Sequence, residues 1–121
     1  MSVIVVRDAD QEWRETSADW PGRAKAGEPK VIYKSLLPGG VPGRPNMQRS
    51  RYEPLHFEPP HSHPEDEVIY VLSGDLIFGD QTLGFGDSLF VPKDTRYSLR
   101  AGEAGAEFVR VGLGEGGAKR V

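Results

Sequence analysis

Two of the three histidines of this 121-residue chain, together with three carboxylates, lie in one segment, His-Ser-His-Pro-Glu-Asp-Glu at positions 61–67. His61 and His63 are two residues apart, so in an extended segment their imidazoles point to the same side. A tight turn at Pro64 would bring the carboxylate of Glu67 back beside them. Two neutral imidazoles and one carboxylate leave open positions on a divalent ion such as Fe(II), Mn(II), Zn(II) or Ni(II). The spacing therefore predicts a metal site, with an exposed polar turn as the alternative.

Acidic residues and one further histidine surround this segment. Glu58 precedes two prolines and is either an acceptor for an imidazole N–H or a surface charge. The same prolines interrupt the alternation of side chains, so the sequence does not show to which face His56 points. One alternative is that His56 is an extra metal ligand. We interpret Glu65 and Asp66 as a solvated acidic turn.

Arg49 and Arg51 lie in the segment that leads to the histidines. Because they are two residues apart, they share a face of an extended strand. If that face is internal, the guanidinium groups would bind a carboxylate or enolate substrate beside the metal. The alternative is that both face solvent.

Short apolar runs separated by turn residues must position these side chains. Gly (15) and Pro (10) are abundant and lie between β-branched runs, which is typical of an antiparallel sandwich or barrel. Residues 8–20 read as a helical turn or loop, residues 38–46 as a loop, and Ser73-Gly74, Gly79-Asp80 and 84–87 as turns. The predicted strands are 3–6, 30–37, 48–57, 68–72, 75–78, 81–83, 88–91, 96–100 and 107–111.

The strand over residues 68–72 is apolar on both faces. Ile69 and Val71 share the parity of Glu67, so we expect them to line the interior. We expect the other face to be covered by the N-terminal segment, with Trp13 and Trp20 packing there, or by a second subunit.

The pattern of His61, His63 and Glu67 followed by Gly74 resembles the first motif of the cupin superfamily. The segment from Gly86-Asp87 to Pro92 is similar to the start of that family's second motif. The resemblance covers about residues 47–111. It implies a double-stranded β-helix, or jelly roll, with a metal in the barrel mouth, a small-molecule substrate or ligand, and a homodimer.

The sequence also departs from the cupin motifs. The usual fourth ligand, a histidine, falls at Tyr97, and the trailing asparagine falls at Ala101. The leading glycine of the first motif falls at Leu55, and an internal glycine of the second motif at Asp94. We interpret Tyr97 as a pocket residue or a partner of a metal-bound water, with phenolate ligation as the alternative.

Composition narrows the class of protein. The net charge is −3 with both signs interspersed, which argues against nucleic-acid binding. No apolar run approaches the roughly 18 residues of a membrane span, and no export signal is visible, so we expect a cytoplasmic protein. The absence of cysteine excludes disulfides and thiolate ligands. The length predicts a single domain, 1–121, with residues 112–121 as a frayed tail.

Two functions are compatible with these residues. The first is a metal-dependent enzyme, either a dioxygenase or a lyase, isomerase or cyclase, acting on a small oxygenated organic molecule. Tyr97 or Glu58 would then be the general acid or base. The second is a non-catalytic cupin that binds a small molecule or metal as a sensor or regulatory module.

Overall fold

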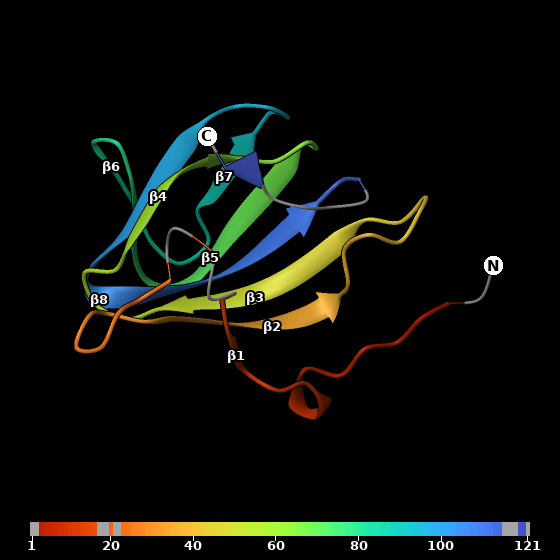
Figure 1. The fold of residues 1–121 in the computed structure, drawn as a ribbon, viewed down its shortest axis with the longest axis horizontal. Coiled ribbons are helices and arrows are strands. Elements are labelled where there is room, and N and C mark those ends of the chain that lie inside the picture. Colours follow the sequence, from red (N-terminus) through yellow and green to blue (C-terminus); the bar gives the residue numbers. More distant parts are fainter. Residues whose placement is uncertain (1–2, 17–19, 21–22, 115–118, 121) are drawn as a thin grey trace.

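The computed structural model describes residues 3–16, 20, 23–114 and 119–120, and every strand pairing within these ranges is antiparallel. The predicted all-β jelly-roll class is confirmed. Figure 1 shows the strands curling around a common interior. The elements are a 3-10 turn η1 (Asp8–Asp10) and the strands β1 (Arg14–Glu15), β2 (Val31–Leu37), β3 (Asn46–Tyr52), β4 (Phe57–Ser62), β5 (Glu67–Phe78), β6 (Gln81–Leu83), β7 (Ser88–Val91), β8 (Tyr97–Gly112) and β9 (Lys119–Arg120).

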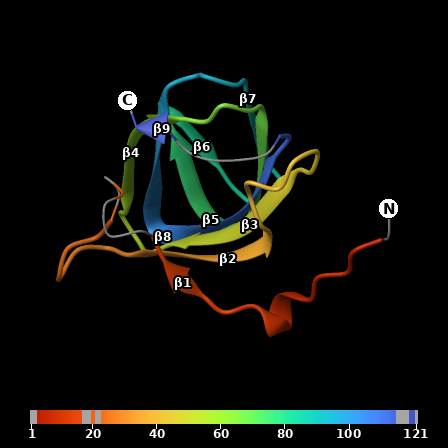
Figure 2. The same cartoon turned by 45° about the vertical axis from the view of Figure 1, so that its right-hand side comes forward.

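The long strands β5 and β8 organise the barrel. β8 pairs with β4 through its first residues and with β3 through its later ones, and it pairs with β5 from Arg100 to Gly112. β5 pairs with β8 on one side and with β6 and β7 on the other. The path β1-β2-β3-β8-β4-β9 completes the sheet. The turned view in Figure 2 looks into the space that β3, β4, β5 and β8 surround.

Two predicted interruptions are bulges inside continuous strands. The sequence predicts a turn at Ser73-Gly74, but β5 runs through it, and β8 likewise joins the two predicted strands 96–100 and 107–111. Gly74 and Gly105 have φ values of 75° and 73°, which a residue without a side chain adopts at little cost. The prediction was wrong because each glycine bends its strand at a bulge while pairing with the neighbouring strand continues.

Several ends differ from the sequence-based expectation. Residues 3–6 form no strand, and Val3 and Val5 are 90% and 72% exposed. The predicted strand 48–57 ends at Tyr52, because the chain turns through Leu55, which has a φ of 68°. Lys119–Arg120, expected in a frayed tail, pairs with β4 as β9. The remaining expectations for 115–118 and 121 lie outside the described residues.

The interior is apolar below the histidine segment. Ile69 and Val71 are almost completely buried, as expected from their parity, and they pack with Leu99 and Phe108. On the other face of β5, Tyr70 is 42% exposed, so the described N-terminal residues do not cover this face as predicted. No helix among the described residues is long and apolar enough to cross a bilayer.

Candidate functional site

Three strands bring the predicted site residues together. His61 lies near the end of β4, His63 just beyond it, Glu67 at the start of β5 and Tyr97 at the start of β8. The ring centroids of His61 and His63 are 5.1 Å apart, and those of His61 and Tyr97 are 4.6 Å apart. His63 Nε2 lies 3.6 Å from Glu67 Oε2. The tertiary structure thus gathers the histidines, the carboxylate and the phenol into one cluster.

The ring of His61 is held by a backbone carbonyl. Its Nδ1 lies 2.9 Å from the oxygen of Pro59, which can only accept a hydrogen bond. Nδ1 therefore carries hydrogen, and in the neutral imidazole the lone pair is on Nε2. Histidine ligands are commonly oriented in this way by a carbonyl on the other nitrogen.

Glu67 is the completely buried member of this cluster, with no solvent exposure. The Tyr97 hydroxyl donates to its Oε1, and Nε of Arg110 donates to its Oε2. Burial, together with the neighbouring Glu67 charge, raises the pKa of Tyr97 well above its ordinary value. Tyr97 therefore remains a neutral hydrogen-bond donor in this environment.

Arg110 belongs to a buried polar network that the sequence analysis missed. Its NH1 donates to Asn46 Oδ1 at 2.7 Å, and its NH2 donates to Glu65 Oε1 at 3.0 Å. Glu65 is only 6% exposed, so its interpretation as a solvated acid was wrong. The physical reason is the turn after β4, which directs this carboxylate inward to Arg110 and Asn46. Arg110 shares strand parity with Phe108, a signal that it faces the interior.

The cluster borders a cavity of about 330 Å³, within the size range of sites for small organic ligands. Polar groups from β3, β4 and β8 and the indole of Trp20 line it, together with apolar side chains deeper in the barrel. Residues of its wall include Trp20, Tyr33, Asn46, Gln48, Ser50, Tyr52, Glu58, His61, His63, Ile69, Tyr97, Leu99, Phe108 and Arg110. Trp20, expected to pack against β5, instead lies edge-on to His61.

His56 and Glu58 form a separate buried pair. His56 Nε2 lies 3.0 Å from Glu58 Oε2, and its Nδ1 lies 3.3 Å from the carbonyl oxygen of Pro29. Both ring nitrogens therefore face oxygen atoms away from the His61 group, and the structure does not bring His56 in as a ligand. Glu58 therefore contacts an imidazole, which was one of the two expectations from the sequence, and that imidazole belongs to His56. Trp20 Nε1 also donates to Glu58.

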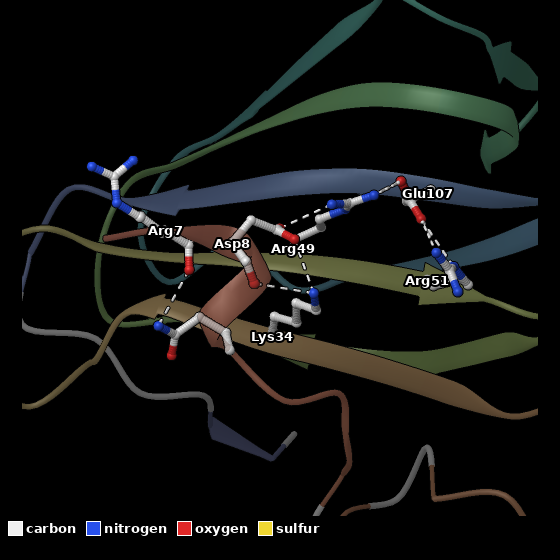
Figure 3. Close-up of polar contacts among 7 residues, drawn as sticks. Arg7, Asp8, Lys34, Arg49, Arg51 and Glu107 are labelled. Carbon is white, nitrogen blue, oxygen red and sulfur yellow. Dashed lines mark hydrogen bonds and ion pairs between the residues drawn. The ribbon is translucent and has the colours of Figure 1, made fainter. Parts of the chain in front are cut away.

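Arg49 and Arg51 point out of the barrel (Figure 3). Arg49 bonds to Asp8 and Glu107, and Arg51 bonds to Glu107. The even-numbered residues of β3 line the cavity, so these two arginines share the opposite face. The interpretation of them as a substrate clamp is therefore wrong for this cavity. Their charges instead surround the ring of Trp13, at 5.5 Å and 4.4 Å.

The comparisons with known proteins identify the family. The model of the family described as "Cupin domain" matches residues 48–112, more than half of the chain. This chain belongs to the cupin family. No curated protein is significantly similar to it in sequence.

Solved structures agree with the cupin fold. An RmlC-like cupin protein from Ralstonia eutropha superposes with a TM-score of 0.75 at 14% identity, over 94% of this chain and 70% of that one. The polyketide cyclase RemF from Streptomyces resistomycificus gives 0.72 at 22%, over 99% and 86%. The DMSP lyase DddQ from Ruegeria pomeroyi gives 0.68 at 20%, over 88% and 58%. At these identities, the likeness establishes the fold.

Cupins commonly bind a divalent metal. The available His61 Nε2, the adjacent His63 and a buried carboxylate are ligand types that such ions accept. Glu65 and Glu67 share one guanidinium, which neutralises half of their combined charge and leaves an environment that favours a cation. The chemistry of the donors therefore fits.

These side chains are of the right types to bind a metal, but the structure does not arrange them as a metal site. Within the described ranges, no three His, Cys, Asp or Glu side chains are arranged as a group that could hold a metal ion. Both oxygens of Glu67 accept hydrogen bonds, from Tyr97 and Arg110, and Glu67 is not part of the cavity wall. Each carboxylate oxygen has a second lone pair, so these bonds and ligation are chemically compatible.

Proposed function

We propose that this cupin binds one divalent metal ion through His61, His63 and Glu67 and acts on a small oxygenated organic molecule in the adjoining cavity. The observation that carries the proposal is the pair of imidazoles and the neutral phenol at the wall of one 330 Å³ cavity, with the buried carboxylate of Glu67 in contact with them. The chemistry that we favour is that of a lyase, isomerase or cyclase.

The residues of the chain supply distinct parts of this activity. A bound metal would polarise a carbonyl or hydroxyl oxygen of the substrate. Tyr97, which lines the cavity, is the candidate acid, and its hydroxyl, which donates to Glu67, would turn toward the substrate. Glu58 is the candidate base at the same wall, although His56 and Trp20 already bind its carboxylate. The apolar side chains of Leu99 and Phe108 would exclude water from the substrate.

Two similar folds support the choice of non-oxidative chemistry. One is a polyketide cyclase and the other a DMSP lyase, each at low sequence identity. Iron held by two histidines and a carboxylate would favour a dioxygenase, whereas the redox-inert Zn(II) would favour non-oxidative chemistry.

The test is elemental analysis by mass spectrometry of untagged protein, beside a His61→Ala/His63→Ala variant. We expect near-stoichiometric metal in the wild type and its loss in the variant. His56→Gln is the matched control, because it removes the third histidine of the chain without touching the cluster and should retain the metal. Zinc, manganese or nickel would direct assays to elimination, isomerisation and cyclisation. Iron would direct them to oxygen consumption with diketones and phenols.

The absence of metal after reconstitution would contradict the proposal. It would favour the second candidate, a cupin that binds a small molecule without catalysis. The observation in favour of that candidate is that Glu67 accepts hydrogen bonds from Tyr97 and Arg110 and does not line the cavity.

We also propose that the protein is a cytoplasmic homodimer. The support for a dimer is the exposed apolar segment of residues 3–6 and the partly uncovered outer face of β5. The cytoplasmic location rests on the sequence alone.

A further inference from the structure

We propose that the cavity binds an uncharged ring compound that carries a carbonyl oxygen, and that the hydroxyl of Tyr52 recognises this oxygen. The inference rests on the small-molecule part of the proposed function, because it concerns the same cavity, but it requires no bound metal. It adds the chemical class of the ligand and a residue that determines specificity for it.

Tyr52 brings a buried hydroxyl to the cavity wall. It is the last residue of β3, on the face whose even-numbered residues line the cavity, and it is 6% exposed. Its ring packs edge-on against His56 and Phe108, with centroid distances of 4.7 Å and 5.0 Å. Within the part of the chain that the structure describes, the hydroxyl makes no hydrogen bond. A buried hydroxyl of this kind takes its partner from water or from a ligand.

The hydroxyls on this face of β3 offer hydrogen to a ligand. Burial, and after it the neighbouring Glu58, raises the pKa of Tyr52 well above its ordinary value, so the phenol keeps its proton at neutral pH. Ser50 lies two residues before it on the same face and is also buried. The Ser50 oxygen accepts from Gln48 Nε2 at 3.1 Å, which leaves the hydrogen of its hydroxyl for an acceptor. A carbonyl oxygen, which only accepts, suits such donors.

The charges at the wall do not favour an anion. Arg110 is the one Arg or Lys among the described residues of the wall, and its guanidinium already donates to Asn46, Glu65 and Glu67. Because two carboxylates share this one cation, a ligand carboxylate would meet repulsion there and no free guanidinium. Glu58, the acid of the wall itself, adds no positive charge. The cavity is therefore suited to an uncharged ligand.

The remaining surface of the cavity favours a ring. Aromatic side chains from several elements line it, and such side chains pack edge-to-face or offset against the ring of a ligand. They are Trp20, Tyr33, Tyr52, Tyr97 and Phe108. The volume of about 330 Å³ is near the lower end of the range for small-molecule sites. It therefore suits a compound of one or two fused rings.

The experiment compares three two-ring probes by equilibrium dialysis against metal-stripped protein in EDTA, at a pH of about 8, where free imidazoles are neutral. The probes are α-tetralone, a ketone; tetralin, the same skeleton without oxygen; and α-naphthoate, a carboxylate. We expect α-tetralone to bind at least about 3-fold more tightly than the more apolar tetralin, because it gains a hydrogen bond. We expect α-naphthoate to bind at least about 10-fold more weakly than α-tetralone.

Tyr52→Phe tests the assigned residue. The substitution removes the hydroxyl and keeps the ring, so it should weaken α-tetralone binding about 2–10-fold and leave tetralin binding unchanged. Tyr70→Phe is the matched control, since Tyr70 is exposed on the outer face of β5 and should affect neither probe. Circular dichroism establishes that both variants are folded.

Each contrary result removes a defined part of the inference. Equal losses for α-tetralone and tetralin in Tyr52→Phe would mean that the hydroxyl recognises no oxygen. Binding of α-naphthoate as tight as that of α-tetralone would overturn the selection of uncharged ligands. If Tyr52→Phe does not fold, tighter binding of tetralin than of α-tetralone by the wild type overturns the recognition of a carbonyl.

Failure of this inference is distinguishable from failure of the metal site. The dialysis is metal-free, so absence of metal in the elemental analysis leaves its result intact. Absence of binding by all three probes would overturn the ligand class, whatever metal the protein holds.

Discussion

Glu67 is a carboxylate in a place that water does not reach, so its partners determine how it behaves. Removing a buried charge from water costs several kcal/mol unless ion pairs and hydrogen bonds compensate. Arg110 and Tyr97 supply that compensation, one at each oxygen. The raised pKa of Tyr97 keeps its hydroxyl available as a donor throughout the neutral range.

Tyr97→Phe tests the structural part of this arrangement. The change removes one donor and leaves Glu67 Oε1 without that bond, so the free energy of unfolding should fall by about 1–3 kcal/mol. Urea denaturation measures the difference. Tyr70→Phe is the matched control, since this tyrosine is 42% exposed on the outer face, and its effect should stay within about 0.5 kcal/mol. Equal effects of the two changes would contradict the importance of the Tyr97 hydroxyl.

At the scale of elements, two glycines allow β5 and β8 to run past each other as bent, continuous strands. Gly74 pairs opposite Ala106, next to Gly105, and both glycines have positive φ. A Cβ built on Gly74 would collide with the backbone of Gly105. The close approach of these two bulges keeps Glu67 at the start of β5 opposite Gly112 at the end of β8.

Gly74→Ala should therefore destabilise the fold by about 3 kcal/mol or more, because backbone strain is added to a collision with fixed backbone. Gly79→Ala is the control: its φ is 60°, but the space around it is open, so only the strain of about 1–2 kcal/mol applies. Chemical denaturation of both variants gives the comparison. If the two glycines cost the same, the contact between the bulges does not matter for stability.

At the scale of the molecule, one row of apolar residues crosses the outer face of the barrel. Met47 pairs with Val111, Val111 with Val68, and Val68 with Phe90, which is 57% exposed. The other three residues are half-buried, and a partly exposed apolar row of this kind is typical of a surface that contacts another protein. Residues 3–6 extend away from the barrel (Figure 1), and their apolar side chains are in solvent.

Light scattering after size exclusion tests the proposed homodimer. We expect a mass of twice 13.3 kDa for the full chain. A variant without residues 2–6 should shift toward the monomer, because it loses apolar contact area, while its circular dichroism spectrum remains that of the barrel. Phe90→Ser should have the same effect from the other side of the contact. A mass of 13.3 kDa for the full chain would rule the dimer out.

The sequence by itself determined the fold class and the histidine cluster. Alternating β-branched runs with glycine and proline between them specify antiparallel strands, and the parity of Ile69 and Val71 correctly predicted that they are buried. The spacing of His61, His63 and Glu67 is local, because period-two alternation fixes which side chains share a face. These features depend on neighbours along the chain, so they can be read without a tertiary structure.

The partners of Glu67 were decided only by the tertiary structure. Arg110 is 43 residues from Glu67 in the chain, and Glu65 faces inward only because its turn packs beside β3 and β8. Alternation along β3 also shows that Arg49 and Arg51 share a face. It does not show whether that face is inside or outside the barrel, because that depends on how the barrel closes. The continuity of β5 through Gly74 depends likewise on the bulge at Gly105. Contacts between residues distant in the chain carry no local signal, because they are set by strand register and barrel closure.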